Sequence, residues 1–210
     1  MPELAADLFT RADNTDLGTA WDVQTGRARF GIVTNAAVPS VLDGDCGENY
    51  NGVTWPDNQY SEGIIGSLSG FATDAGIGTM VRASASAHTC YWCATNAASG
   101  VDTVLGKFIA GVFTQLGTAD AGFVTGDTIY LEVQGSTLLV KKNGVTVIGP
   151  ITDTSIASGR AGILYSSTIG AASLASWAGG DFAGGGLTTE YVAPVYDLMK
   201  SGGMIGRQYV

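Results

Sequence analysis

The chain has 210 residues, of which 31 are glycine and only 14% are charged, and its 10 basic and 19 acidic side chains give a formal net charge of −9. This balance provides no basic face for phosphate groups, so we expect no nucleic-acid partner. No stretch approaches the roughly 18 apolar residues of a membrane span. The N-terminus lacks the basic and apolar segments of a secretory signal, and three cysteines suit a reducing compartment. We therefore expect synthesis in the cytoplasm without a signal peptide.

Short strand-like segments follow one another along the chain with little helical periodicity between them. The many glycines supply the positive φ angles that tight turns between such strands need. Strands are expected at residues 21–24, 29–34, 59–65, 78–85, 88–95, 104–110, 162–166 and 172–177. Together with the segment described next, this spacing predicts an all-β fold, a jelly-roll sandwich of two antiparallel sheets.

The clearest strand pattern lies in GDTIYLEVQGSTLLVKKNGVTVIGPITD, residues 126–153. Ile129, Leu131 and Val133 alternate with polar residues, which indicates a strand with one buried face. The pattern resumes after a glycine turn at Leu138, and Asn143-Gly144 marks a second tight turn. The segment predicts an antiparallel meander of three strands.

The stretch HTCYWCATN, residues 88–96, contains the only histidine and two of the three cysteines. On an extended strand, side chains three positions apart point to opposite faces, so Cys90 and Cys93 cannot share a metal ion or form a disulfide. No helix pattern follows, as a thioredoxin-like pair would require. We predict a strand with Tyr91 and Cys93 on one face, and with His88, Cys90 and Trp92 on the other.

The acidic residues give no sign of a catalytic pair. The five glutamates are Glu3, Glu48, Glu62, Glu132 and Glu190, and even the closest two are fourteen positions apart in the sequence. Retaining glycoside hydrolysis needs two carboxyl groups about 5 Å apart, and only a meeting of Glu62 and Glu132 across strands could supply them. A Ser-His-Asp relay would depend on His88 alone. We therefore predict no catalytic residues and no enzyme.

An irregular excursion is expected over PSVLDGDCGENYNGVTWP, residues 39–56. Its acidic part offers oxygen ligands that suit calcium, namely Asp43, Asp45, Glu48 and Asn49. No other cofactor is expected. The aromatic residues Tyr50, Trp55 and Tyr60 are candidates for stacking on sugar rings, or alternatively for capping one end of the sandwich.

The pattern changes after Asp181, where a glycine run begins and the strand alternation ends. We divide the chain into a sandwich domain over residues 1–182 and a C-terminal docking extension over residues 183–210. An apolar, glycine-rich terminus frays unless it is docked on a partner. The residues expected to dock on a partner are Tyr191, Val192, Val195, Tyr196, Leu198 and Met199.

DLFTRADNTDLGTAWDV, residues 7–23, resembles the opening of concanavalin A-like (laminin-G-like) jelly-roll domains, many of which come from bacteriophage and bacterial surface proteins. The resemblance continues through Arg82, GDTIYLEVQG, Asn143-Gly144 and SGRAGILY, and covers residues 7–182. It implies a two-sheet sandwich whose first and last strands pair.

The resemblance, taken with the lack of paired catalytic groups, the missing secretion signal and the C-terminal extension, favours a non-catalytic structural or binding role. The first expectation is a subunit of the phage virion surface, a capsid decoration or fibre-associated protein, located in the virion. Its tail would bind other virion proteins or copies of itself. The alternative is a lectin-like, carbohydrate-binding module that recognises host or mucosal glycans. A polysaccharide-active hydrolase is the third alternative.

Overall fold

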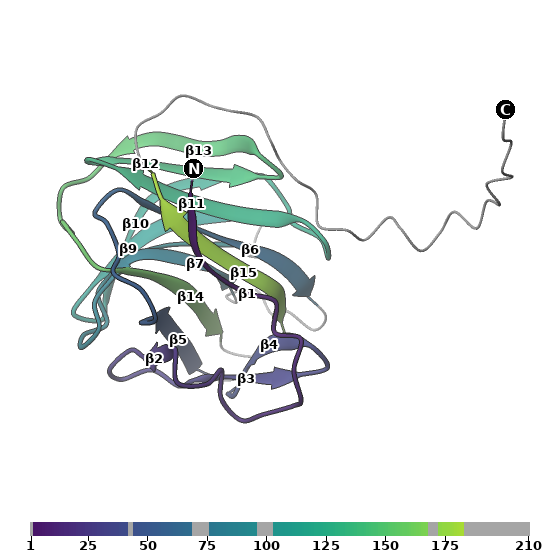
Figure 1. Cartoon of the computed structure of the whole chain (residues 1–210). Coiled ribbons are helices and arrows are strands. Elements are labelled where there is room, and N and C mark those ends of the chain that lie inside the picture. The colour runs from purple at the N-terminus through teal and green to yellow at the C-terminus, as the bar shows by residue number, and fades with distance from the viewer. Residues whose placement is uncertain (1, 42–43, 69–75, 96–102, 168–171, 183–210) are drawn as a thin grey trace, which may run out of the picture.

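In the computed structural model the chain folds into two antiparallel β-sheets packed face to face as a sandwich (Figure 1). The structure describes residues 2–41, 44–68, 76–95, 103–167 and 172–182. The eight-stranded sheet contains β1 (Glu3–Asp7), β3 (Phe30–Val33), β4 (Ala36–Pro39), β6 (Gln59–Ser67), β11 (Thr128–Gln134), β12 (Thr137–Lys142), β13 (Val145–Thr152) and β15 (Ser173–Asp181). The seven-stranded sheet contains β2 (Trp21–Val23), β5 (Gly44–Tyr50), β7 (Gly76–Ala83), β8 (Cys90–Thr95), β9 (Thr103–Ile109), β10 (Val112–Ala119) and β14 (Arg160–Ser167).

The all-β prediction is confirmed, and so is the pairing of the first and last strands. β1 runs antiparallel to β15, with Ala6 opposite Ala178 (Figure 1). The seven-stranded sheet has the order β10-β9-β8-β7-β14-β5-β2, so β5 and β9 are separated by three intervening strands. Within the described residues there is no helix long and apolar enough to cross a membrane.

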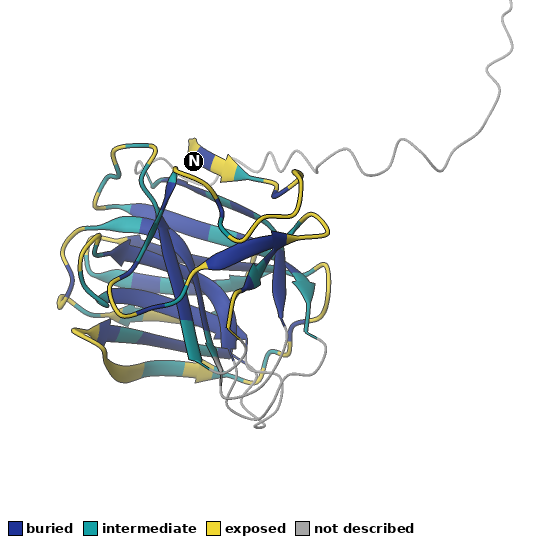
Figure 2. Cartoon of the chain, turned by 90° about the horizontal axis from the view of Figure 1, so that it is seen from below, coloured by how far each residue is buried: buried dark blue, intermediate teal, exposed yellow. Residues whose placement is uncertain are grey.

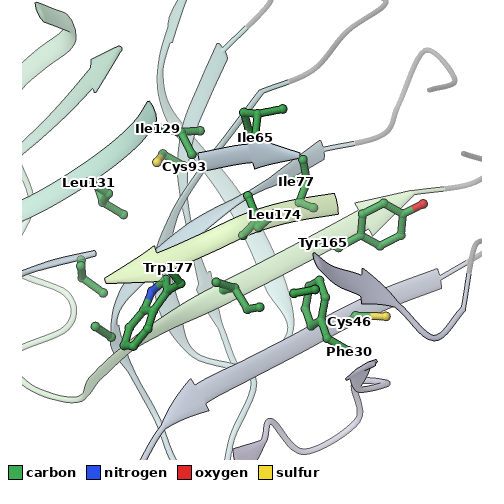
Figure 3. Packing of buried hydrophobic residues seen from close by; sticks show 14 of the residues in the cluster. Phe30, Cys46, Ile65, Ile77, Cys93, Ile129, Leu131, Tyr165, Leu174 and Trp177 are labelled. Carbon is green, nitrogen blue, oxygen red and sulfur yellow. The ribbon is translucent and has the colours of Figure 1, made fainter. Parts of the chain in front are cut away.

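The main core lies between the two sheets and is filled by large apolar side chains from both of them. Trp177, Leu174 and Ile65 of the eight-stranded sheet meet Ile77 and Tyr165 of the other (Figure 3). All five of these side chains are buried, and the strands are mostly buried while the turns between them are exposed (Figure 2). Packing of this kind is the main source of stability for a sandwich.

The expected strand positions agree with those of the structure, including the three-strand meander β11, β12 and β13. Four further strands, β1, β4, β5 and β10, had not been predicted. In the meander, Ile129, Leu131 and Val133 face the core as the alternation indicated. The division into a sandwich and a docking extension stays a prediction, because residues 183–210 lie outside the described residues.

The prediction of an irregular excursion over residues 39–56 is wrong, because β5 lies within it and pairs with both β14 and β2. Its polar residues hid the strand, since they are buried with partners far away in the sequence. The carboxyl group of Glu48 accepts a hydrogen bond from the Phe30 amide at 2.7 Å. The amide of Asn49 donates to the carbonyl oxygens of Asp22 and Ser84.

Candidate functional site

The segment around Cys90 forms strand β8 with the predicted alternation of faces. Tyr91 and Cys93 belong to the core between the sheets, whereas Cys90 and Trp92 belong to a second apolar cluster. All three cysteines of the chain are buried and free, and burial raises the pKa of both the Cys90 and the Cys93 thiols to about 12. These thiols are therefore packing residues rather than nucleophiles.

The second apolar cluster lies on the outer face of the seven-stranded sheet, away from the core. It consists of Met80, Ala83, Cys90, Trp92, Ala94, Phe108 and Leu164. The rings of Trp92, Phe108 and Phe113 lie together on this surface, each in contact with the other two. The distances between ring centroids are 5.8 Å for Trp92 and Phe108, 5.2 Å for Phe108 and Phe113, and 6.3 Å for Trp92 and Phe113. We call these three rings the aromatic row. Phe113 is its accessible member, with 43% of the residue exposed.

Arg27 and His88 lie against the aromatic row from one side. The guanidinium carbon of Arg27 lies 4.8 Å from the centre of the Phe108 ring, and the His88 ring lies 4.1 Å from the same ring. Arg27 Nη2 contacts His88 Nε2, and Arg27 Nη1 pairs with Asp45 Oδ2 at 2.7 Å. A cation over an aromatic face is an attractive arrangement, and it strengthens when water is excluded.

These contacts show that the seven-stranded sheet is strongly curved. Arg27 is anchored beside β5, where Ala28 forms a bridge with Cys46, yet its side chain reaches Phe108 on β9. A flat sheet would place β5 and β9 about 19 Å apart, at roughly 4.8 Å per strand. Even extended toward each other, the Arg27 and Phe108 side chains and the 4.8 Å between them fall short of that distance. The outer face is therefore concave, and Arg27 bridges it.

Burial also sets the charge of this face. Burial, with the neighbouring Arg27 guanidinium, lowers the pKa of His88 to about 4, so the imidazole is neutral at neutral pH. Burial likewise lowers the pKa of Arg27, against the pull of Asp45. An arginine stays protonated under these conditions, so Arg27 is the cation beside the aromatic row.

Several polar groups on this face are buried without a hydrogen-bond partner. The chain has four tryptophans, and the indole N–H groups of Trp21, Trp55 and Trp177 donate to Asp7, Tyr50 and Ser61 respectively. The indole N–H of Trp92 has no partner. The same holds for the side-chain amide of Gln24 and for Arg27 Nε. Native structures leave few such groups unpaired, and each one calls for an explanation.

Gln24 and Arg27 are neighbours on the concave face. A Cβ atom placed on Gly47 would lie 3.0 Å from Gln24 Oε1 and 3.5 Å from Arg27 Cγ. Gly47 faces outward because Cys46 and Tyr50, on the alternate positions of β5, pack in or against the core. The absence of a side chain at Gly47 therefore makes room for both polar groups.

The predicted sugar-stacking residues lie in two separate places. Tyr50 and Trp55 pack against Trp177 at one end of the core, with ring centroids 5.4 Å and 6.1 Å from it. They form the cap that was the alternative expectation for them. Tyr60 lies on the outer face of the eight-stranded sheet, stacked on Tyr130 at 5.4 Å.

The predicted calcium ligands do not form the expected loop. Asp45 pairs with Arg27, Glu48 binds the Phe30 amide, and Asn49 Oδ1 accepts a hydrogen bond from Arg160 at 3.0 Å. Glu48 and Asn49 are successive strand residues, so their side chains point to opposite faces. Among the residues that the structure describes, no three His, Cys, Asp or Glu side chains form a group that could hold a metal ion. Asp43 lies outside those residues, as do the docking residues expected between 191 and 199.

Glu62 and Glu132 lie on the paired strands β6 and β11, a proximity that no sequence spacing indicated. β6 and β11 pair so that Tyr130 is opposite Glu62 and Glu132 is opposite Tyr60, which makes the two glutamates diagonal neighbours on one face. Lys141 Nζ lies 2.8 Å from Glu132 Oε2. Burial, with a contribution from the negative charge of Glu3, raises the pKa of Glu62.

Three residues of the candidate site, Arg27, Phe108 and Phe113, are not indicated by the sequence pattern alone. A signal for the pairing of the two phenylalanines is present in FIAGVF, residues 108–113. A two-residue turn containing glycine places the residues on either side of it opposite each other, and Phe108 and Phe113 are indeed paired across the turn. Arg27 carries no such signal, because its contacts with Asp45, His88 and Phe108 are 18 to 81 positions away in the sequence.

No family model matches the sequence, and no curated protein matches it. Among solved structures, the carbohydrate-binding module CBM66 from Bacillus subtilis is similar at a TM-score of 0.62 and 17% identity, over 76% of this chain and 94% of that one. A beta-1,3-glucanase from Mycobacterium marinum is similar at a TM-score of 0.55 and 8% identity, over 86% of this chain and 99% of that one. The exoplasmic/lumenal domain of VIP36 in its Ca2+/Man-bound form is similar at a TM-score of 0.55 and 10% identity, over 84% of this chain and 86% of that one.

These similarities show a two-sheet antiparallel β-sandwich, and at such low identity they show the fold alone. They also correct one prediction. The expectation that the chain is not an enzyme is overturned, because the same fold occurs in glycoside hydrolases such as the glucanase. The expected link to a phage virion has no support from these structures.

Proposed function

We propose that this protein binds glycans on the concave face of its seven-stranded sheet. The observation that carries the proposal is the unpaired indole N–H of Trp92 within the aromatic row, beside the unpaired polar atoms of Gln24 and Arg27. Sugars present an apolar face of C–H groups and a rim of hydroxyl groups. A surface that combines aromatic rings with a few buried donors fits both.

The similarity in fold to a carbohydrate-binding module and to VIP36 supports this proposal. Attachment to a virion stays a separate prediction that concerns the C-terminal residues. It is compatible with glycan binding, because a displayed domain is free to recognise carbohydrates.

Phe113 provides the first test, because it is the exposed ring of the row and is not part of the core between the sheets. Replacement of Phe113 by alanine is expected to weaken glycan binding about tenfold, the loss of roughly 1.4 kcal/mol that one aromatic contact contributes. A glycan array followed by titration calorimetry measures this effect. Val145→Ala is the matched control, since Val145 is also an exposed apolar strand residue but lies on β13 of the other sheet. Equal affinity in both variants and in the wild type would place the glycan elsewhere.

Glycoside hydrolysis is a second function, favoured by the diagonal pair of Glu62 and Glu132. The backbones of diagonal neighbours on adjacent strands are about 7–8 Å apart, so two glutamate side chains at such positions can bring their carboxyl groups to the separation of roughly 6.5–9.5 Å that inverting glycosidases use. Glu62, whose pKa is raised, suits the acid, and Glu132 suits the carboxylate. If this pair is catalytic, release of reducing ends from a polysaccharide panel is lost in both Glu62→Gln and Glu132→Gln. Equal release by the wild type and both variants would dismiss the pair.

A further inference from the structure

Arg27 lies over an aromatic ring of the concave face and is almost completely buried there. Arg27 has only 9% of its surface exposed, its Nε has no hydrogen-bond partner, and its guanidinium lies over Phe108. A guanidinium is a planar fork that matches a carboxylate through two parallel hydrogen bonds. In this structure one of the donors of the Arg27 guanidinium, Nε, makes no hydrogen bond.

The present partners of Arg27 are replaceable. The side chain of Asp45, which forms the ion pair, is 41% exposed, so water can solvate its carboxylate if it turns away. His88 is neutral and adds no competing charge. A carboxylate that enters beside the ring of Phe108 would replace Asp45 and leave the guanidinium neutralised.

Gln24 lies next to the Arg27 side chain. The side chain of Gln24 is fully buried, and neither its oxygen nor its nitrogen has a partner. Its Oε1 and the Cγ of Arg27 both lie within 3.5 Å of the Cβ position of Gly47. Gln24 and Arg27 are therefore neighbours around Gly47, at the margin of the aromatic row, and each has side-chain polar atoms without a hydrogen-bond partner.

We propose that the preferred ligands are acidic sugars, in which a ring carboxylate binds Arg27 and Gln24 while the sugar ring stacks on the aromatic row. This inference rests on the proposed glycan-binding function and names the ligand class of the same site. A neutral sugar would use the rings and the indole N–H of Trp92 but would leave the Arg27 fork unfilled. Charge-assisted hydrogen bonds are about twice as strong as neutral ones, so the carboxylate decides selectivity.

The test compares matched ligands on the full-length protein. The probes are trigalacturonic acid against its methyl ester, and sialyllactose against lactose, each measured by titration calorimetry. At least one acidic member is expected to bind about tenfold more tightly than its neutral partner, equivalent to about 1.4 kcal/mol. Its affinity is also expected to fall with added salt, as screening predicts.

Two variants separate this role from a structural one. Asp45→Asn removes the competing ion pair and is expected to strengthen acidic-sugar binding about threefold to tenfold, with neutral-sugar binding unchanged. Arg27→Gln is expected to reduce acidic-sugar affinity to the neutral level, with thermal unfolding measured alongside. If Arg27→Gln fails to fold, Asp45→Asn, altered at a half-exposed side chain, decides the question.

The outcomes distinguish the two proposals. Equal binding of the acidic and neutral members of both pairs would overturn the inference while supporting glycan binding. An Asp45→Asn variant with no gain for the acidic sugar would also overturn it. If neither these probes nor a broad glycan array gives any binding, the proposed function itself fails.

Discussion

Replacement of Arg82 by methionine is expected to lower the free energy of unfolding by about 3–5 kcal/mol, because three main-chain acceptors lose their donor together. The Arg82 guanidinium donates to the carbonyl oxygens of Asp57, Gly135 and Ile156 at 2.7–2.9 Å. These acceptors belong to connections of the eight-stranded sheet or lie next to it, whereas Arg82 itself belongs to β7 of the other sheet. The residue therefore fastens the two layers at one end.

Chemical unfolding in urea measures this effect. Arg29→Met is the control, since Arg29 is half exposed and its contact with Asp16 is long, at 3.5 Å. An exposed pair of this kind contributes at most about 1 kcal/mol. Comparable losses in the two variants would show that Arg82 does not fasten the sheets.

Replacement of Glu48 by glutamine is expected to stabilise the protein in a pH-dependent way. Burial raises the pKa of Glu48 to about 7, although the Phe30 amide and Arg29 oppose the shift. The folded state thus holds a proton that the unfolded chain, with an ordinary glutamate pKa, releases at lower pH. The stability contributed by this group is therefore present at low pH and is lost as the pH rises through about 7.

The size of the Glu48 effect follows from the shift. The difference from the ordinary value of 4.5 corresponds to about 3 kcal/mol between acidic and mildly alkaline solution. Glutamine keeps an acceptor for the Phe30 amide and cannot ionise. Unfolding measured from pH 5 to pH 8.5 is expected to show Glu48→Gln gaining on the wild type as the pH rises. Parallel pH profiles would contradict the assignment of a protonated Glu48.

Strands could be predicted from the sequence where a local pattern marks them. β11 alternates cleanly because one face meets the core, and β8 could be assigned by side because Cys90 and Cys93 are an odd number of positions apart. β5 escaped notice because its buried residues include Glu48 and Asn49, whose partners become evident only in three dimensions. β10 escaped notice because it is an edge strand that is largely exposed and therefore shows no alternation.

The candidate site was less predictable, because it is assembled from segments far apart in the sequence. Trp92 was placed on the correct face, but neither its unpaired indole nor the curvature that brings Arg27 to Phe108 has a local signature. Tyr60 was singled out, yet its stacking partner Tyr130 and the neighbouring Glu132 come from a strand about seventy positions later. Residue types indicated candidates, and sheet register decided which of them share a surface.

The most direct measurement is a titration of the isotope-labelled protein with an array-selected glycan, observed at the four tryptophan indole N–H groups by NMR. Trp92 has the free donor, whereas Trp21, Trp55 and Trp177 already donate within the core or at its end. Glycan binding on the concave face predicts a large shift of the Trp92 indole signal, with the other three nearly unchanged. A saturated complex in which the Trp92 signal does not move, or the lack of any glycan that binds, would contradict the account.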